Sequence, residues 1–409
     1  MNTRLVSTLL LCTILLVTNR WLSFQEGLDI AKAADTISYM AIAKAAPALP
    51  SEMFAQNHTM RLVPSWIVGT VAHGIGISEE RMFLLLTVLV CAAIVAVVHR
   101  LLQHIGLHDA QYTLCMALVV LNPYTFRYYL AVPAMVADMV FVLGLASVLL
   151  GLLRVQPVVV LAGGIVAAIG RQNALVFLPA VLLWLWVGNG WKERSTVQRG
   201  LWSMAYLAAV MMPYSMISSI VAPFSQKTSM EAKALTGIFL WLGSDAPHKA
   251  TMLAEYMVRM NICLVFPVFI TFALFLAKRG AFTTFTAFVQ NLPREMWLAL
   301  LVFAALYGFA LLGGPEEYMT GVTRYVSHAF LALIIVFAVI LRQVGAVQHI
   351  RTTVAVVVGL CVVAGSLHHL TTIIGSNSDK ASVFAVLHAA MALFAAITLY
   401  GSERRAQQP

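Results

Sequence analysis

The feature that most constrains this chain is a recurring run of apolar residues, each close to the length that a helix needs to cross a bilayer, about 20 residues. We count about twelve such segments, at residues 5–22, 82–103, 110–124, 132–153, 156–169, 173–188, 201–222, 257–277, 296–313, 327–342, 352–374 and 383–400. Of the 409 residues, 61% are hydrophobic and only 11% are charged, against roughly 25% charged residues in a soluble domain. The sequence therefore predicts an all-α polytopic membrane protein.

The positions of lysine and arginine predict which side of the membrane each loop faces. In the second half of the chain they fall on alternate loops, as Lys192, Arg194 and Arg199, then Lys278 and Arg279, then Arg342 and Arg351, then Arg404 and Arg405. Cytoplasmic loops are enriched in these residues. Residues 223–256, 314–326 and 375–382 are therefore expected outside. The first apolar run follows Arg4 and lacks a small-residue cleavage site, which predicts an uncleaved first helix.

Two topologies fit the first half. Either residues 62–77 cross the membrane and residues 156–188 form one long helix, or residues 62–77 lie outside and the long segment breaks near Arg171. We prefer the second, because an unbroken helix would leave Arg171 in the hydrocarbon at several kcal/mol. Arg171 is then expected at the outer surface. The polar segments of the first half, at residues 20–81, 122–138 and 170–173, then share that face.

The first outer loop, residues 20–81, is too long for a plain connector and too apolar for a disordered linker, so it is expected to be structured. Residues 28–46 fit a helix that places Asp35 and Tyr39 on one face. A second short helix is expected from Pro64 to about Ile77.

These motifs carry a resemblance. Asp35-x-x-x-Tyr39 is followed by His58-x-x-Arg61-x-x-Pro64, by an outer segment ending in Asp138 at the head of a span, and by the Gly-Arg171-Gln-Asn173 break. In this order they resemble the GT-C class of membrane glycosyltransferases, particularly those that use polyprenyl-phosphate sugars, such as protein mannosyltransferases and aminoarabinose transferase. The resemblance implies a GT-C-like bundle with a catalytic module over residues 1–250, including outer loop 223–256, and further transmembrane helices over residues 251–409.

The expected activity is inverting transfer of a sugar from a polyprenyl-phosphate donor to an acceptor outside the membrane, which the compact chain suggests is the bacterial inner membrane. Asp35 is our candidate general base. Asp138 is the second catalytic candidate, and the alternative is a structural pairing with an arginine. The predicted substrate-binding residues are Tyr39, His58, Arg61, Arg171, Asn173 and Arg324, in which the guanidinium groups suit phosphate.

Several interpretations of other residues stay open. Alternatively, the side chains of Arg171, Gln172 and Asn173 form hydrogen bonds with the backbone groups left unpaired at the helix break. Arg324 is alternatively in an ion pair with Glu316 or Glu317. The Tyr124-to-Tyr129 segment is interpreted first as an interfacial aromatic belt. The Gly237–Gly243 stretch is apolar enough to enter the membrane and line a groove for the donor's lipid chain.

No cofactor, metal site or nucleic-acid partner is expected, because no basic stripe or ligand cluster occurs in the sequence. One carboxylate, Asp35, stands where many members of the resembled class carry two. The main alternative function is a twelve-helix secondary transporter of a small or lipid-linked solute. A polysaccharide polymerase or ligase is the third possibility. Against the transporter, the sequence has no matching Gly/Pro-broken segments in two related halves.

Overall fold

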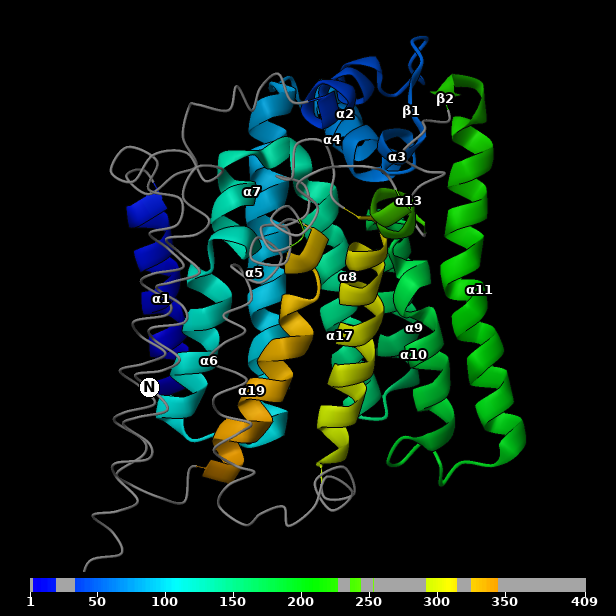
Figure 1. Ribbon diagram of the computed structural model, residues 1–409. Helices are drawn as coiled ribbons and strands as arrows, with labels where there is room; N and C mark the ends of the chain where they lie inside the picture. Colours follow the sequence, from blue (N-terminus) through cyan, green and yellow to red (C-terminus); the bar gives the residue numbers. More distant parts are fainter. Residues whose placement is uncertain are drawn as a thin grey trace, which may run out of the picture.

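The computed structural model describes residues 3–19, 34–226, 236–243, 253, 292–314 and 325–344, and these are almost entirely helical (Figure 1). Long helices stand side by side as a bundle, and short helices cover one of its ends. The upright helices are α1 (Thr3–Asn19), α5 (Glu79–Ile105), α6 (Asp109–Leu121), α8 (Val136–Leu153), α9 (Pro157–Gly170), α10 (Ala174–Val187), α11 (Thr196–Val221), α17 (Arg294–Leu312) and α19 (Phe330–Val344).

Four segments of the described part are long and apolar enough to cross a membrane: Glu79–Ile105, Pro133–Leu153, Thr196–Phe224 and Arg294–Leu312. The outward face of α11 supports this assignment, since Leu201, Met204 and Met212 are each more than 60% exposed. Apolar side chains in such a row favour a lipid environment over water. Twelve spans stay a prediction, because the expected spans at 257–277, 352–374 and 383–400 lie outside the described residues.

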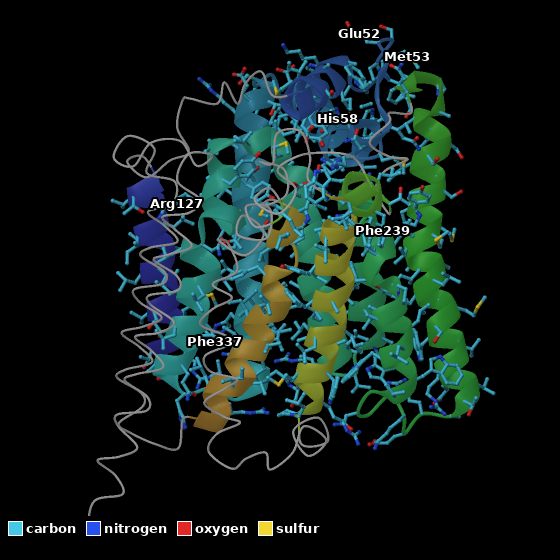
Figure 2. All side chains as sticks on the ribbon, viewed as in Figure 1. Glu52, Met53, His58, Arg127, Phe239 and Phe337 are labelled. Carbon is cyan, nitrogen blue, oxygen red and sulfur yellow. The ribbon has the colours of Figure 1, made fainter. Side chains whose placement is uncertain are left out.

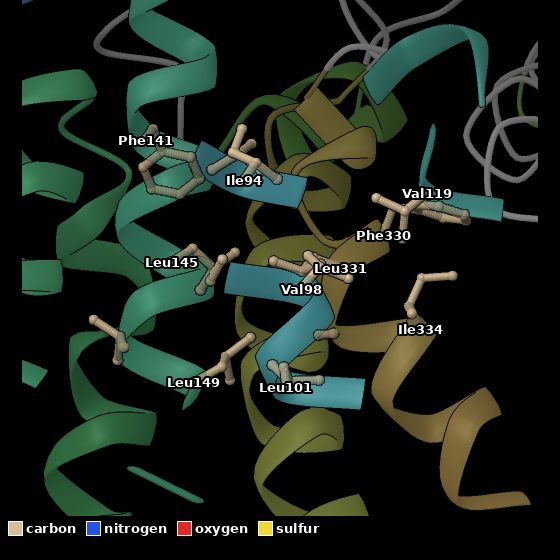
Figure 3. Packing of buried hydrophobic residues seen from close by; sticks show 14 of the residues in the cluster. Ile94, Val98, Leu101, Val119, Phe141, Leu145, Leu149, Phe330, Leu331 and Ile334 are labelled. Carbon is tan, nitrogen blue, oxygen red and sulfur yellow. The ribbon is translucent and has the colours of Figure 1, made fainter. Parts of the chain in front are cut away.

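Helix α5 packs between α8 and α19 at the centre of the bundle (Figure 3). On α5 and α8 the packed side chains repeat at three or four residues, the spacing that puts them on one helix face, and on α19 Ile334 follows the adjacent Phe330 and Leu331 at the same spacing. They are Ile94, Val98 and Leu101 of α5, Phe141, Leu145 and Leu149 of α8, and Phe330, Leu331 and Ile334 of α19, all at most 5% exposed. Described parts of both predicted modules, 1–250 and 251–409, therefore share one core.

The segment between α1 and α5, predicted as the first outer loop, is structured in its described part and lies over one end of the bundle (Figure 1). It contains α2 (Ala34–Ala45), β1 (Phe54–Ala55), α3 (Gln56–Thr59) and α4 (Leu62–Ile75). The expected helix over residues 28–46 is present from Ala34, and residues 20–33 lie outside the described part. Strand β1 pairs in parallel with β2 (Ser225–Gln226), which follows α11 and the short turn η4 (Ala222–Phe224). This pairing holds the loop against the end of α11.

Helices α9 and α10 are separate, which confirms the predicted break near Arg171. Short turns at the same end of the bundle connect α6 to α8. They are η2 (Pro123–Arg127), α7 (Tyr128–Ala131) and η3 (Pro133–Met135). The short helix α13 (Gly237–Gly243) also lies near this end (Figure 1). The polar segments that the preferred topology put on one face therefore meet at one end.

The contact of α2 with α4 depends on Gly69. A Cβ atom added there would come within 1.9 Å of the Ala43 carbonyl oxygen, closer than any real contact. We expect Gly69→Ala to push α2 away and destabilise the protein by about 1–3 kcal/mol, the usual range for overpacking. Gly74 of the same helix is the matched control, because nothing lies within 4 Å of its added Cβ. Thermal unfolding in detergent should separate the two variants, and equal midpoints would contradict the packing argument.

Candidate functional site

Polar side chains from separate segments of the chain form one connected network at the end of the bundle that the first loop covers (Figure 2, near His58). Most of them are buried, although they carry the charges of two arginines and two aspartates. The network consists of Asp35, Ser38 and Tyr39 of α2, His58 and Arg61 at α3, Tyr129 of α7, Asp138 of α8, Arg171 at the α9–α10 break, and Tyr325 and His328 before α19.

Asp35 lies at the rim of this network. Its Oδ1 is 2.7 Å from His58 Nε2, and its Oδ2 is 3.6 Å from a terminal nitrogen of Arg61. The Asp35 side chain is 20% exposed, against 9% for His58 and 2% for Arg61. The first turn of α2 therefore places a partly exposed carboxylate at the rim of the network, with its supporting groups buried behind it.

Arg61 connects the two carboxylates. The same guanidinium nitrogen donates to the Tyr39 hydroxyl and lies 3.9 Å from Asp138 Oδ1. Burial raises the pKa of Tyr39 above its usual range, although the Arg61 charge opposes that shift. Tyr39 therefore stays a neutral phenol that accepts from Arg61. Because Asp35 and Tyr39 are four residues apart on α2, they face the same side of the helix.

Asp138 lies in the buried interior of the network and is 1% exposed. Arg171 donates to its Oδ1, the Tyr129 hydroxyl donates to its Oδ2 at 3.2 Å, and His328 Nε2 lies 3.7 Å from Oδ2. The expected alternative for Asp138, a pairing with an arginine, is thus present in the structure. Burial among several partners suits a carboxylate that holds other groups in place.

Gly170 brings Arg171 to Asp138. A Cβ atom added at Gly170 would lie 2.3 Å from the Phe141 backbone nitrogen and 2.8 Å from the Ala137 carbonyl oxygen. The end of α9 can therefore approach the start of α8 closely only without a side chain at that position. Arg171 lies at the expected helix break, but its side chain is buried within the protein, at 2% exposed. Because Arg171 is shielded from water, the ion pair with Asp138 balances its positive charge.

The remaining predicted site residues are less closely tied to the network. Asn173 is buried at the start of α10, two residues after Arg171, and within the described part no hydrogen bond joins its side chain to the network. Arg324 lies outside the described residues. Its neighbour Tyr325 does belong to the network, because the Arg171 guanidinium lies over its ring at 5.1 Å from the centre.

Sequence reasoning did not assign Ser38, Tyr129 or His328 to the site. Tyr129 was interpreted as part of an aromatic belt, yet it is fully buried and donates to Asp138. His328 had a usable signal, since an ionisable residue at the start of an apolar segment is a functional candidate by default. Ser38 had the i, i+3 spacing from Asp35, which places both on one face of α2.

Two further observations concern ligands. Within the described ranges, no three His, Cys, Asp or Glu side chains gather as metal ligands would. Helix α13 exposes Phe239, Leu240 and Leu242, and its Gly237 lies against the Gly313–Gly314 backbone at the end of α17. The predicted apolar Gly237–Gly243 stretch is thus helical, with an exposed apolar face near the covered end of the bundle.

We compared the chain with models of protein families, with curated proteins and with solved structures, and none of these comparisons gives a match.

Proposed function

We propose that this chain is an integral membrane glycosyltransferase that transfers a sugar from a polyprenyl-phosphate donor to an acceptor hydroxyl outside the membrane. The observation that carries the proposal is the position of Asp35. It is the accessible carboxylate of a network that also holds two buried arginines, and it has a hydrogen-bonding histidine and an arginine beside it. Six of the residues that suggested the activity in the sequence are joined in this network, namely Asp35, Tyr39, His58, Arg61, Asp138 and Arg171.

The proposed reaction assigns a separate role to each carboxylate. Asp35 takes the proton of the acceptor hydroxyl as its oxygen bonds to the anomeric carbon. The bond from that carbon to the phosphate oxygen breaks, and polyprenyl phosphate leaves. Asp138 is the buried positioning residue that holds Arg171 and lies near Arg61. Arg324 is the proposed direct partner of the phosphate, since a guanidinium group matches its geometry. The buried Arg61 and Arg171 are proposed to stabilise the phosphate charge through the positive charge that they add to the network.

The distribution of basic residues supports an outward-facing site. Basic residues occur at the helix ends opposite the network: Arg4 at the start of α1, Arg100 and Arg154 near the ends of α5 and α8, Lys192, Arg194 and Arg199 between α10 and the first turn of α11, Arg294 at the start of α17 and Arg342 near the end of α19. Membrane proteins concentrate such residues on the cytoplasmic side. We therefore propose that the first loop and Asp35 face the exterior. The proposal of a bacterial inner membrane rests on the compactness of the chain alone.

The apolar face of α13 supports a lipid-linked donor. Phe239 is 63% exposed and Leu240 is 58% exposed, close to the end of the bundle where the network lies. A polyprenyl chain needs an apolar surface that leads toward the site of transfer. We propose that α13 supplies part of that surface, as the sequence of this stretch suggested.

The test is a turnover assay of the purified full chain in detergent with a panel of undecaprenyl-phosphate monosaccharides. Mass spectrometry follows the release of the lipid phosphate, with a set of acceptor sugars and lipids present. We expect sugar-dependent release with at least one donor. If every donor stays intact while proteoliposomes containing the protein move a solute, the transporter alternative replaces the glycosyltransferase.

A further inference from the structure

His73 of α4 connects the end of α2 to the first residue of α5, where these three helices meet over the bundle (Figure 1). Its Nδ1 lies 2.6 Å from the backbone carbonyl oxygen of Ala46, just beyond the end of α2, and its Nε2 lies 3.0 Å from Glu79 Oε1. The His73 side chain is 40% exposed and the Glu79 side chain is 19% exposed. Unlike the buried network around Asp138, this contact can therefore exchange protons with water.

The two partners of His73 determine the protonation state in which both contacts form. A backbone carbonyl oxygen has no hydrogen to donate, and an ionised carboxylate only accepts hydrogen bonds. Glu79 is the first residue of α5, where the helix dipole favours the ionised form of a carboxylate. Both ring nitrogens must then carry hydrogens, which is the charged imidazolium form. A neutral ring has one N–H and turns a lone pair toward one of the two oxygens.

The other charged groups of the adjoining helices do not replace His73 in this role. Lys44, in the last turn of α2, is the other cation whose charge acts on Glu79. Glu80 and Arg81 follow Glu79 in α5, and within the described residues neither side chain forms a hydrogen bond or ion pair with His73. Lysine, arginine and glutamate ordinarily keep their charges between pH values of about 5.5 and 8.5, whereas histidine does not. His73 is therefore the group whose charge changes in this range.

We propose that His73 is a pH-sensitive clamp, which holds the end of α2 on the start of α5 when its ring is protonated and releases it when the ring is neutral. The closed clamp contains a proton that the open clamp gives up at higher pH. Its stabilising effect is therefore complete at low pH and is lost as the pH rises. Because α2 also carries Asp35 and Tyr39, the clamp couples the placement of the partly exposed carboxylate to the pH at this end of the bundle.

Hydrogen–deuterium exchange of the full chain in detergent tests the clamp without any turnover. Exchange in peptides that cover residues 40–49 is measured at pH values of about 5.5 and 8.5, on either side of the usual histidine pKa, and is divided by the intrinsic exchange rate at each pH. In the wild type we expect protection to fall about tenfold at the higher pH, the factor that one hydrogen bond to a charged group contributes. His73→Phe should show the lower protection at both pH values. Glu79→Gln should show the higher protection at both, because its amide can donate to Nε2 of a neutral ring.

Trp66→Phe is the matched control, since the Trp66 indole donates to the Pro47 carbonyl oxygen at 3.0 Å and carries no charge at either pH. Its loss should lower protection of the same peptides by one factor at both pH values. Wild-type protection that does not change with pH overturns the inference, and so does a change that persists in Glu79→Gln. The exchange measurement does not depend on sugar transfer, so a failed donor assay would remove the proposed function and leave the result on the clamp standing.

Discussion

Asp35→Asn is expected to abolish sugar transfer while the protein stays folded and still binds its donor. The amide has nearly the size of the carboxylate, and its oxygen can still accept from His58 Nε2, which lies 2.7 Å from Asp35 Oδ1. It cannot take a proton from an acceptor hydroxyl. General-base catalysis contributes roughly 10²- to 10⁴-fold to a rate, so we expect kcat to fall at least about 100-fold. The measurement is release of lipid phosphate from the donor.

Glu52→Gln is the matched control for this variant. Glu52 lies on the same loop and is exposed (Figure 2). Like Asp35→Asn, the Glu52→Gln variant removes one negative charge from that end of the protein. We expect it to retain wild-type turnover. Donor binding by both variants is followed by the shift of the thermal unfolding midpoint with added donor. Full activity of Asp35→Asn would remove Asp35 from the proposed mechanism, and equal losses in both variants would point to surface charge instead.

The helical framework of this chain could be predicted because its cause is local. Apolar runs of membrane length predict most of the helix positions. The high free-energy cost of placing an arginine in hydrocarbon predicts the break between α9 and α10. The spacing of Asp35 and Tyr39 gives the inward face of α2. In the described part, α2 runs from Ala34 to Ala45, within the range of residues 28–46 that the sequence predicts.

The partners of the charged residues could not be predicted, because they depend on contacts between distant segments. The burial of Arg171 requires Asp138 of α8, and the burial of Asp138 requires Tyr129 and His328 as well. No local pattern gives these pairings. The parallel contact of β1 with β2 likewise joins two strands of two residues each, too short to have a sequence signal. The sequence therefore identified most members of the network without showing how they are connected.

Removing the charge of Asp138 is expected to destabilise the protein strongly. Asp138 is 1% exposed and Arg171 is 2% exposed, so Asp138→Asn leaves a buried guanidinium without its carboxylate. Breaking one side of such a pair typically costs about 3–5 kcal/mol. We expect a clear fall in the thermal unfolding midpoint of the detergent-purified protein. Asp109→Asn is the control, because Asp109 is 50% exposed and its ion pair with Arg4 lies at the opposite end of the bundle. An exposed pair contributes about 0–1 kcal/mol.

The double variant Asp138→Asn with Arg171→Met tests whether the loss arises from the uncompensated charge. Methionine removes the guanidinium and fills a similar length of the cavity, while Arg61 keeps its contacts with Asp35 and Tyr39. Replacing a buried ion pair by well-packed apolar residues of similar volume is often neutral or stabilising, and this double variant leaves no buried charge in the pair. We therefore expect the double variant to recover most of the stability that Asp138→Asn loses, and to remain without sugar transfer because the positive charge of Arg171 is proposed to stabilise the phosphate. A double variant as unstable as Asp138→Asn alone would show that Asp138 acts through Tyr129 and His328 instead of through Arg171.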